Sequence, residues 1–124
     1  MIDFQNAGYV KLGPVPLADV ESQVQPLLVE AEELYAAFKG MRDYIAFTSK
    51  RIIAVNVQGI TGKKKDFTSL PYSKIQAFSV ESSGSFDLDA ELELWFSGLG
   101  KVKFEFKGET DVASLNKLVA AHVL

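Results

Sequence analysis

The sequence predicts one mainly β domain that ends in an amphipathic helix. Three observations lead to this fold class. Seven short β-like runs follow one another after residue 32, turn residues separate them, and no helical stretch long enough for a parallel crossover lies between them. The pattern therefore favours an antiparallel barrel or sandwich over a parallel α/β sheet.

The composition is that of an ordinary globular domain. The chain has 124 residues, of which 48% are hydrophobic and 23% are charged, and this balance favours neither disorder nor a membrane span. The net charge of −3 argues against general nucleic-acid binding. There is no Cys for a disulfide or a thiolate site, and the first residues lack the pattern of a secretory signal. We therefore expect a cytoplasmic protein.

The first expected element is a short helix in an N-terminal extension of residues 1–28. Pro16 suits its first turn, and Pro26 should end or kink it near Gln25. We therefore predict a helix over residues 17–25. Its apolar stripe, at helical spacing, consists of Leu17, Val20, Val24, Leu27 and Leu28.

The seven β-like runs lie in residues 29–124, which we expect to form the barrel and its C-terminal helix as a single domain. Each run combines apolar and β-branched or aromatic residues, and turn residues stand between the runs. We predict one strand for each of residues 33–38, 44–48, 52–57, 65–70, 75–80, 90–96 and 101–107.

The last two runs predict a half-buried hairpin, because apolar and polar residues alternate in both. The apolar positions are Leu92, Leu94, Phe96, Val102, Phe104 and Phe106. If apolar residues face one another, Phe96 pairs with Val102 around a loop of residues 98–100. The same register pairs Leu94 with Phe104, Trp95 with Lys103, and Glu91 with Lys107.

The final segment predicts an amphipathic helix of about three turns that packs on the sheet. Thr110 is the expected N-cap, and Asp111 should lie in the first turn. The residues on or near the packed face are Val112, Leu115, Leu118, Val119 and His122.

Two basic turns are candidates for an anionic-ligand patch. The Gly62-Lys63 pair resembles a phosphate loop, but Val57 and Lys64 stand where the Walker pattern needs Gly and a hydroxyl residue. A tight hairpin turn with lysines that protect a sheet edge is the favoured interpretation. If both turns lay close together in the fold, their basic residues could attach the protein weakly to an anionic membrane. The favoured alternative is that the two turns lie apart and are solvated. The candidate patch is Lys50, Arg51, Lys63, Lys64 and Lys65.

The sequence predicts no metal site, no cofactor and no catalytic activity. Acidic residues recur at every second position at Asp87, Asp89, Glu91 and Glu93. That spacing is typical of a solvated strand face, which Lys103 and Lys107 would neutralise, and it lacks the pattern of a calcium loop. His122 is the single histidine, and its place near a helix end favours an interaction with the last carbonyls over general-base catalysis.

Four sequence blocks carry a resemblance to a known family. They read AFTSKRII at residues 46–53, GITGKK at 59–64, LPYSKI at 70–75, and FSVE followed by FDLDAEL within 78–92. Together with seven strands followed by one helix, these blocks resemble the bacterial pleckstrin-homology-like family. The resemblance implies a seven-stranded, partly open barrel capped by the C-terminal helix, in proteins that have no established enzymatic activity and assemble as ring-shaped homo-oligomers.

From the resemblance we expect a non-catalytic, self-associating scaffold or interaction domain. The stripe Leu17, Val20, Val24, Leu27 and Leu28 and the sheet face around Trp95 are the expected interface, although periodicity alone equally allows the stripe to pack on its own barrel. The alternative function is a membrane-surface or anionic-ligand module. Eukaryotic relatives that bind phosphoinositides carry several basic residues on the first two strands, where this chain has Lys39 and Arg42. A third class is binding of a partner strand at the sheet edge beside the C-terminal helix.

Overall fold

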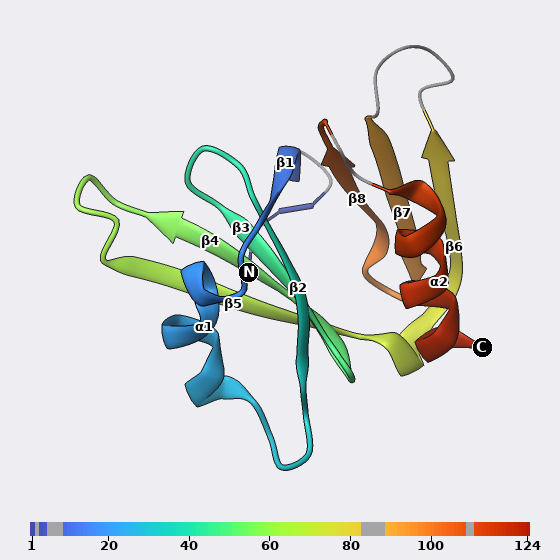
Figure 1. The fold of residues 1–124 in the computed structure, drawn as a ribbon, viewed down its shortest axis with the longest axis horizontal. Coiled ribbons are helices and arrows are strands. Elements are labelled where there is room, and N and C mark those ends of the chain that lie inside the picture. Colours follow the sequence, from blue (N-terminus) through green and yellow to red (C-terminus); the bar gives the residue numbers. More distant parts are fainter. Residues whose placement is uncertain (2, 5–8, 83–88, 109–110) are drawn as a thin grey trace.

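The structure is a computed structural model that describes residues 1, 3–4, 9–82, 89–108 and 111–124. It confirms a mainly β fold with a short helix and a C-terminal helix. It contradicts the expected seven antiparallel strands, because eight strands form one mixed, open sheet in the order β5-β4-β3-β2-β1-β8-β7-β6. Figure 1 shows two halves of this sheet, β1 to β5 and β6 to β8, with α2 beside the second half.

The seven predicted strands are all present, and β3 and β7 have the predicted bounds. The other five differ from the prediction by at most two residues at either end. The elements in chain order are β1 (Tyr9–Val15), α1 (Ala18–Val24), η1 (Gln25–Leu27), β2 (Leu34–Lys39), β3 (Tyr44–Thr48), β4 (Arg51–Gln58), β5 (Lys64–Pro71), η2 (Tyr72–Lys74), β6 (Ile75–Ser82), β7 (Ala90–Phe96), β8 (Gly100–Phe106) and α2 (Val112–Val123).

Strand β1 is the one strand of the described sheet that the sequence patterns did not predict. Gly13 and Pro14 are disfavoured in strands. The strand forms because it changes partner along its length: Tyr9 and Leu12 pair with β8 in parallel, and residues 13–15 pair antiparallel with β2. Past Leu12, therefore, β1 has a partner strand on one side only, where a proline without an N–H is tolerated. The segment expected to be an extension thus supplies a central strand.

Helix α1 packs against the sheet of its own chain. Val20 and Val24 are buried in a cluster with residues of β2, β3 and β4, and Leu28 packs against that cluster. As expected, the α-helix ends before Pro26, which lies in η1. Two members of the predicted stripe, Val20 and Val24, are therefore unavailable to another subunit.

A larger cluster fills the space between the two halves of the sheet and α2. Ile45 and Phe47 of β3 belong to it, whereas Tyr44 and Ala46 belong to the cluster under α1. Because both faces of β3 are covered, all five of its residues are buried. Phe104 is also buried in the larger cluster.

The hairpin of β7 and β8 has the predicted faces but a different register. The six predicted core residues are all buried, yet Leu94 pairs with Val102 and Phe96 with Gly100, two residues away from the prediction. The loop is therefore residues 97–99, with Gly98 at a φ of 84°. A shift of two keeps every side chain on its face, so alternation alone cannot distinguish the two registers.

The charged residues on the outer face of this hairpin pair differently from the prediction. Lys103 Nζ lies 3.5 Å from Glu91 Oε1 and 3.3 Å from Glu105 Oε1, and Lys101 Nζ lies 3.5 Å from Glu93 Oε2. Lys103 does neutralise acidic neighbours, as expected. Because of the two-residue shift in register, Glu91 lies opposite Glu105 rather than opposite Lys107.

Helix α2 is capped by Asp111, which was expected in the first turn. Its carboxylate accepts hydrogen bonds from the N–H groups of Ala113 and Ser114, at 3.0 and 3.2 Å. Leu115 and Val119 are buried against the core. The predicted cap Thr110 and the acidic Asp87 lie outside the described residues. None of the helices in the described part of the chain is long and apolar enough to span a bilayer.

Candidate functional site

A cavity of about 560 Å³ lies at the start of β1. Residues of β1 form one side, the turn between β2 and β3 forms another, and Lys107 lies at the end of β8. The lining residues are Tyr9, Val10, Lys11, Leu12, Gly40, Met41, Arg42, Asp43 and Lys107. Three cationic side chains thus share this cavity with one carboxylate, and we refer to it as the β1 cavity.

An irregularity in β1 places Lys11 at this cavity. The register between β1 and β8 shifts between Tyr9 and Leu12, and Lys11 has a φ of 54°. A left-handed backbone is uncommon for a side chain such as lysine. Bulges of this kind redirect a side chain and are frequent beside functional sites.

The turn between β2 and β3 lies close to β1 and is hydrogen-bonded to β4. The N–H of Gly40 donates to the carbonyl of Asp43 at 2.8 Å, and a Cβ on Gly40 would lie 3.3 Å from the carbonyl oxygen of Val10. The carboxylate of Asp43 accepts the N–H of Val57 at 2.8 Å and the amide of Asn56 at 3.2 Å. The one acidic group of the cavity is therefore already engaged.

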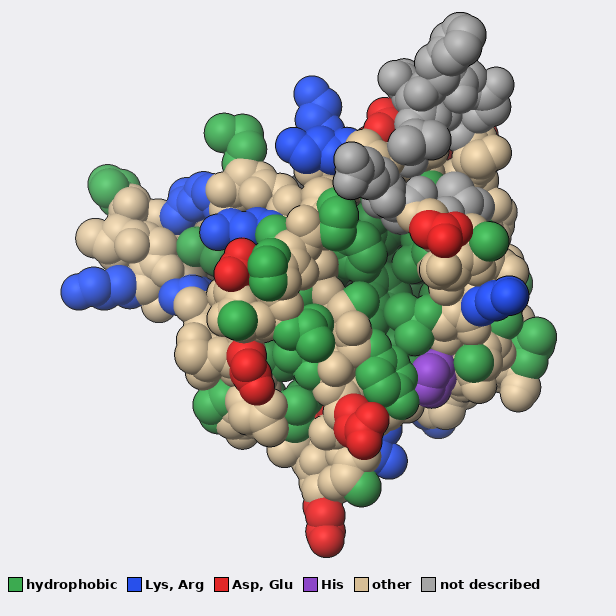
Figure 2. All heavy atoms as spheres, in the orientation of Figure 1, with side chains coloured by type: hydrophobic (Ala, Val, Ile, Leu, Met, Phe, Trp, Pro, Cys, Tyr) green, Lys and Arg blue, Asp and Glu red, His purple; other side chains and the backbone are tan. Residues whose placement is uncertain are grey.

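The β2–β3 turn and the β4–β5 turn meet to form a tip. A guanidinium N–H of Arg42 donates to the carbonyl of Gly59, which ties the two turns together. Met41 on the first turn and Ile60 on the second are fully exposed. Figure 2 shows basic and hydrophobic side chains together over these two turns. We call this region, Met41, Arg42, Ile60, Lys63 and Lys64, the basic tip.

Tyr9 contributes a buried polar atom beside the same cavity. The side chain is 2% exposed, and its hydroxyl has no hydrogen-bond partner among the described residues. Burial, with smaller contributions from the carboxylates of Asp43 and Asp66, raises the pKa of Tyr9 far above its usual range. The hydroxyl therefore keeps its proton at neutral pH and remains a donor.

The structure does not bring the five residues of the predicted basic patch together. Arg51 pairs with Pro71 at one end of the β4–β5 hairpin, and Lys64 pairs with Gln58 at the other. At about 3.3 Å per residue, the two ends lie roughly 23 Å apart. Lys63, Lys64 and Lys65 therefore lie toward the basic tip, whereas Lys50 and Arg51 lie at the far end.

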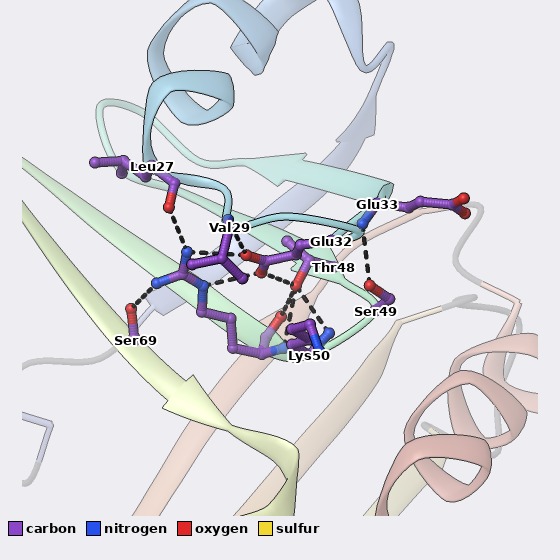
Figure 3. Close-up of polar contacts among 9 residues, drawn as sticks. Leu27, Val29, Glu32, Glu33, Thr48, Ser49, Lys50 and Ser69 are labelled. Atoms are coloured by element: carbon purple, nitrogen blue, oxygen red, sulfur yellow. Dashed lines mark hydrogen bonds and ion pairs between the residues drawn. The ribbon is translucent and has the colours of Figure 1, made fainter.

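Arg51 instead belongs to a buried ion pair with Glu32, shown in Figure 3. Its Nε and Nη2 donate to the two carboxylate oxygens of Glu32 at 2.9 and 3.1 Å, and Nη2 also donates to the carbonyl of Leu27 at 2.7 Å. The hydroxyl of Thr48 donates to Glu32 at 2.5 Å. The side chain of Glu32 is 0% exposed and that of Arg51 is 20% exposed.

The surroundings of Glu32 stabilise its charged form. Burial raises its pKa, but the hydrogen bonds from Arg51, Thr48 and the N–H of Val29 outweigh burial and hold the pKa below its usual value. This arrangement connects the segment before β2 to the β3–β4 turn. It stabilises the fold, and the guanidinium of Arg51 donates its hydrogen bonds to groups of the same chain.

The remaining residues of the predicted interface are only partly covered. Leu17 and Leu27 are 36% and 38% exposed, and Leu28 and Trp95 are half-buried. A second hollow of about 220 Å³ is here called the α2 groove. Its lining residues are Pro14, Ala36, Phe38, Asp111, Ser114, Leu115 and Leu118. Figure 2 shows hydrophobic side chains in a hollow near the centre of the view.

His122 lies in the last turn of α2, where we expected it to interact with carbonyls at the helix end. Its Nδ1 donates to the carbonyl of Leu118 at 2.8 Å, and its ring lies 5.6 Å from that of Tyr35 and 5.0 Å from that of Tyr72 between centroids. Within the described ranges, no group of three acidic or histidine side chains is placed to hold a metal ion.

The sequence did not predict that the cations of the β1 cavity lie close together, and the reason is physical. Lys11 and Lys107 are 96 positions apart, and they converge only because β1 pairs in parallel with β8. The one local signal was the spacing of Tyr9 and Leu12, two buried residues three positions apart, which indicates a bulge in a strand.

Comparisons with known proteins agree with this fold. The model of a family described as "Bacterial PH domain" matches residues 3–123. Two uncharacterized proteins of Bacillus subtilis strain 168 are similar. YjqA is 48% identical over 106 residues, covering 84% of this chain and 85% of YjqA, and YozO is 33% identical over 101 residues, covering 82% and 87%.

Two crystal structures share the architecture. A DUF1696 family protein with a pleckstrin-homology domain from Shewanella loihica PV-4 is 39% identical with a TM-score of 0.80, and the match covers 93% of this chain and 99% of that one. A pleckstrin homology domain from Shewanella amazonensis SB2B is 42% identical with a TM-score of 0.67, covering 96% and 93%.

Proposed function

This chain belongs to the bacterial PH domain family, and on that premise we propose that it is a non-catalytic interaction domain that assembles head to tail with copies of itself. Self-association is supported by two apolar surfaces that the chain leaves uncovered. One is the α2 groove. The other, here called the α1 flank, is the exposed set Leu17, Leu27 and Val29.

The two surfaces lie at opposite sides of the molecule, since α1 and α2 flank different halves of the sheet (Figure 1). A contact between different surfaces of identical chains is heterologous, and it closes into a ring if the rotation between neighbours permits. Such a ring is the assembly we propose. The α1 flank of one copy would enter the α2 groove of the next.

The α1 flank alone is too small to hold an assembly. Complete burial of one large apolar side chain contributes about 1.5–3 kcal/mol, and these side chains are already partly covered. Association costs roughly 4–15 kcal/mol. Strands β5 and β6 end the sheet and each has an edge without a neighbouring strand in the described sheet, so edge contacts and the face around Trp95 would supply the rest.

The non-catalytic part of the proposal is supported by the position of His122. Its Nδ1–H is engaged by the carbonyl of Leu118, and two tyrosine rings contact the imidazole. A general base needs a nucleophile or substrate within hydrogen-bond reach. The side chain instead stabilises the end of α2.

We expect the purified protein at micromolar concentration to have a light-scattering mass several times 13.6 kDa. The double variant Leu17→Gln/Leu27→Gln should have a lower mass, because it places polar groups on the α1 flank. Ile60→Gln is the matched control, since it changes an exposed apolar residue on the basic tip. A monomeric wild type would refute self-assembly, and an unchanged mass of the double variant would refute the role of the α1 flank.

A variant that lacks residues 1–28 is unsuitable for this test. The deletion removes β1 from between β2 and β8, so a change of mass would reflect damage to the sheet. Point changes on the α1 flank avoid this, because Val20 and Val24 continue to cover the sheet.

A second function, attachment to an anionic membrane surface, is favoured by the basic tip. Met41 and Ile60 are fully exposed on adjoining turns, beside Arg42, Lys63 and Lys64. Exposed apolar residues next to basic ones are typical of protein surfaces that bind membranes. Each basic residue near an anionic surface contributes about 1 kcal/mol.

We expect salt-sensitive co-sedimentation with vesicles that contain phosphatidylserine. Lys63→Ala/Lys64→Ala should weaken the partition coefficient roughly 30-fold, which corresponds to about 2 kcal/mol. The control pair Lys50→Ala/Lys74→Ala removes the same charge from the far end of the hairpin and should have little effect. Equal losses in both pairs would show that net charge, rather than the basic tip, governs binding, and absence of binding at low salt would refute this function.

A further inference from the structure

We propose that β1 is a displaceable strand and that the gap between β2 and β8, which it fills, binds an extended segment of another protein. Figure 1 shows β1 between the two halves of the sheet. A segment in its place would pair antiparallel with β2 and parallel with β8, as β1 does. Addition of a strand to an existing sheet is a common mode of binding for extended segments. We call this gap the β1 slot, and binding in it does not depend on the self-assembly proposed above.

β1 is paired with its neighbours over short stretches. Tyr9 and Leu12 have partners in β8, and residues 13–15 have partners in β2. Strand β4, by contrast, pairs with β5 along its whole length, from Arg51 to Gln58. Local opening takes less free energy where few backbone hydrogen bonds hold a segment. β1 is therefore the strand of the described sheet that we expect to open first.

The backbone of Lys11 is strained in the β1 slot. Its φ of 54° is left-handed, a conformation that Gly, Asn and Asp adopt more readily than Lys. The register with β8 also shifts at this place, between Tyr9 and Leu12. A competing segment with Asp at the position of Lys11 would fill the slot with less strain.

The same position also favours an acidic residue by charge. Lys11 and Arg42 line one cavity, so two like charges lie on its wall. Arg42 belongs to the β2–β3 turn and donates a hydrogen bond to the carbonyl of Gly59, so it remains when β1 leaves. The carboxylate of Asp43 in the same wall already accepts hydrogen bonds from β4. A carboxylate at the position of Lys11 would be attracted to Arg42, and strain and charge thus both select Asp there.

Tyr9 and Leu12 define the apolar side of the slot. The ring of Tyr9 lies 5.7 Å from that of Phe104 and 6.0 Å from that of Phe4 between centroids, and Leu12 is buried in the same cluster. The hydroxyl of Tyr9 is buried without a partner among the described residues, which costs free energy that Phe would avoid. The preferred partner segment therefore has Phe, any residue, Asp and an aliphatic residue in succession.

The rest of the fold can stay in place when β1 leaves. Pro16 and Leu17 connect β1 to α1, and Val20 and Val24 bury α1 against β2, β3 and β4. The incoming segment restores the pairs that β2 and β8 lose. Exchange of β1 therefore does not require unfolding of the domain.

The test uses the full chain and fluorescently labelled peptides, with binding followed by fluorescence anisotropy. One peptide has the natural sequence of residues 3–16, and the adapted peptide carries Tyr9→Phe and Lys11→Asp. We expect saturable binding of the adapted peptide, at least about tenfold tighter than that of the natural peptide, since relief of one strained backbone position accounts for such a ratio. A peptide of the same composition in scrambled order should not bind.

A reversible disulfide shows whether the peptide occupies the β1 slot. Gly13 and Lys39 are partners between β1 and β2. The Cα atoms of antiparallel partners lie about 4.5–5.5 Å apart, within the span of a disulfide, and the natural chain has no cysteine. Oxidised Gly13→Cys/Lys39→Cys should bind the adapted peptide at least about tenfold more weakly than the same protein after reduction. Both states have one sequence, so the reduced form is the control.

Lys11→Asp in the full chain should have the opposite effect from Lys11→Asp in the peptide. In the chain it stabilises β1 in its own slot, so the fraction of open molecules falls and the adapted peptide binds about tenfold more weakly. Hydrogen exchange of the β1 amides should slow by a similar factor, while exchange in β4 stays unchanged. A melting curve verifies that the variant is folded.

Binding that persists in the oxidised form would place the peptide on another surface and refute the slot. Absence of saturable binding, or hydrogen exchange in wild-type β1 as slow as in β4, would refute the displaceable strand. Equal binding of the natural and adapted peptides would refute the selection of Phe and Asp. A light-scattering mass that falls when Gly13→Cys/Lys39→Cys is oxidised would show that the occupant is β1 of a second copy, and would overturn the assignment to another protein.

Discussion

Replacing Phe104 by Ala is expected to lower the free energy of unfolding by about 3–5 kcal/mol, as the loss of a large core side chain does. Phe104 is 0% exposed. Its ring packs edge-on against Tyr9 at 5.7 Å and against Phe4 at 6.5 Å between centroids. The substitution therefore leaves a void where β1, β7 and β8 meet, and these rigid strands cannot close it completely.

Lys103→Ala is the matched control for Phe104→Ala, because it changes the preceding residue on the opposite face of β8. Lys103 forms only exposed ion pairs, with Glu91 and Glu105, and such pairs contribute about 0–1 kcal/mol. Urea unfolding at one pH measures both variants. Similar small losses for both would contradict the position of Phe104 in the core.

Replacing Arg51 by Met is expected to destabilise the fold by about 3–5 kcal/mol, because it leaves the buried carboxylate of Glu32 without its cation. Thr48 and the N–H of Val29 would still donate to Glu32, but both are neutral. Lys101→Met is the control, since it removes a cation from the exposed pair with Glu93 and should cost less than about 1 kcal/mol.

The double variant Glu32→Gln/Arg51→Met distinguishes an unpaired charge from lost packing. It contains no buried charge, so we expect it to recover part of the stability that Arg51→Met alone loses. If the double variant is no more stable than Arg51→Met, packing and hydrogen bonds of Arg51 account for the loss, and the buried charge does not.

The same pair gives the protein a component of acid sensitivity. Because the pKa of Glu32 is lower in the folded protein than its usual value of 4.5, the folded state binds this proton less readily than the unfolded state. The stabilisation is therefore complete above the unfolded pKa and is lost as pH falls through the folded pKa. Unfolding curves between neutral and acidic pH should show a smaller acid loss for Glu32→Gln than for wild type.

The basic patch illustrates how local sequence can mislead about a site. Lys50-Arg51 and Lys63-Lys64-Lys65 are both basic turns in the sequence, and only the pairing of β4 with β5 shows that they lie at opposite ends of one hairpin. Arg51 is also committed to Glu32, a partner 19 positions earlier. Burial of that pair depends on the segment before β2 folding back over the β3–β4 turn, which no local pattern specifies.

The seven predicted strands, the two faces of the β7–β8 hairpin, and the C-terminal helix follow from the sequence alone. These features depend on periods of 2 and 3.6 residues, which are local and are written directly in the order of apolar and polar residues. Leu92 and Leu94 could therefore be assigned to the core without knowledge of their partners.

Only the tertiary structure decided the eighth strand, the hairpin register and the β1 cavity. β1 exists because β2 and β8 both offer it an edge, in spite of Gly13 and Pro14, and the hairpin register was free to shift by two residues without exposing its core face. The cavity unites Lys11 and Lys107 through a parallel pairing across nearly the whole chain. Such contacts depend on which of several distant segments pairs with a given sheet edge or fills a given part of the core. The alternation of apolar and polar residues within one segment does not specify its partner.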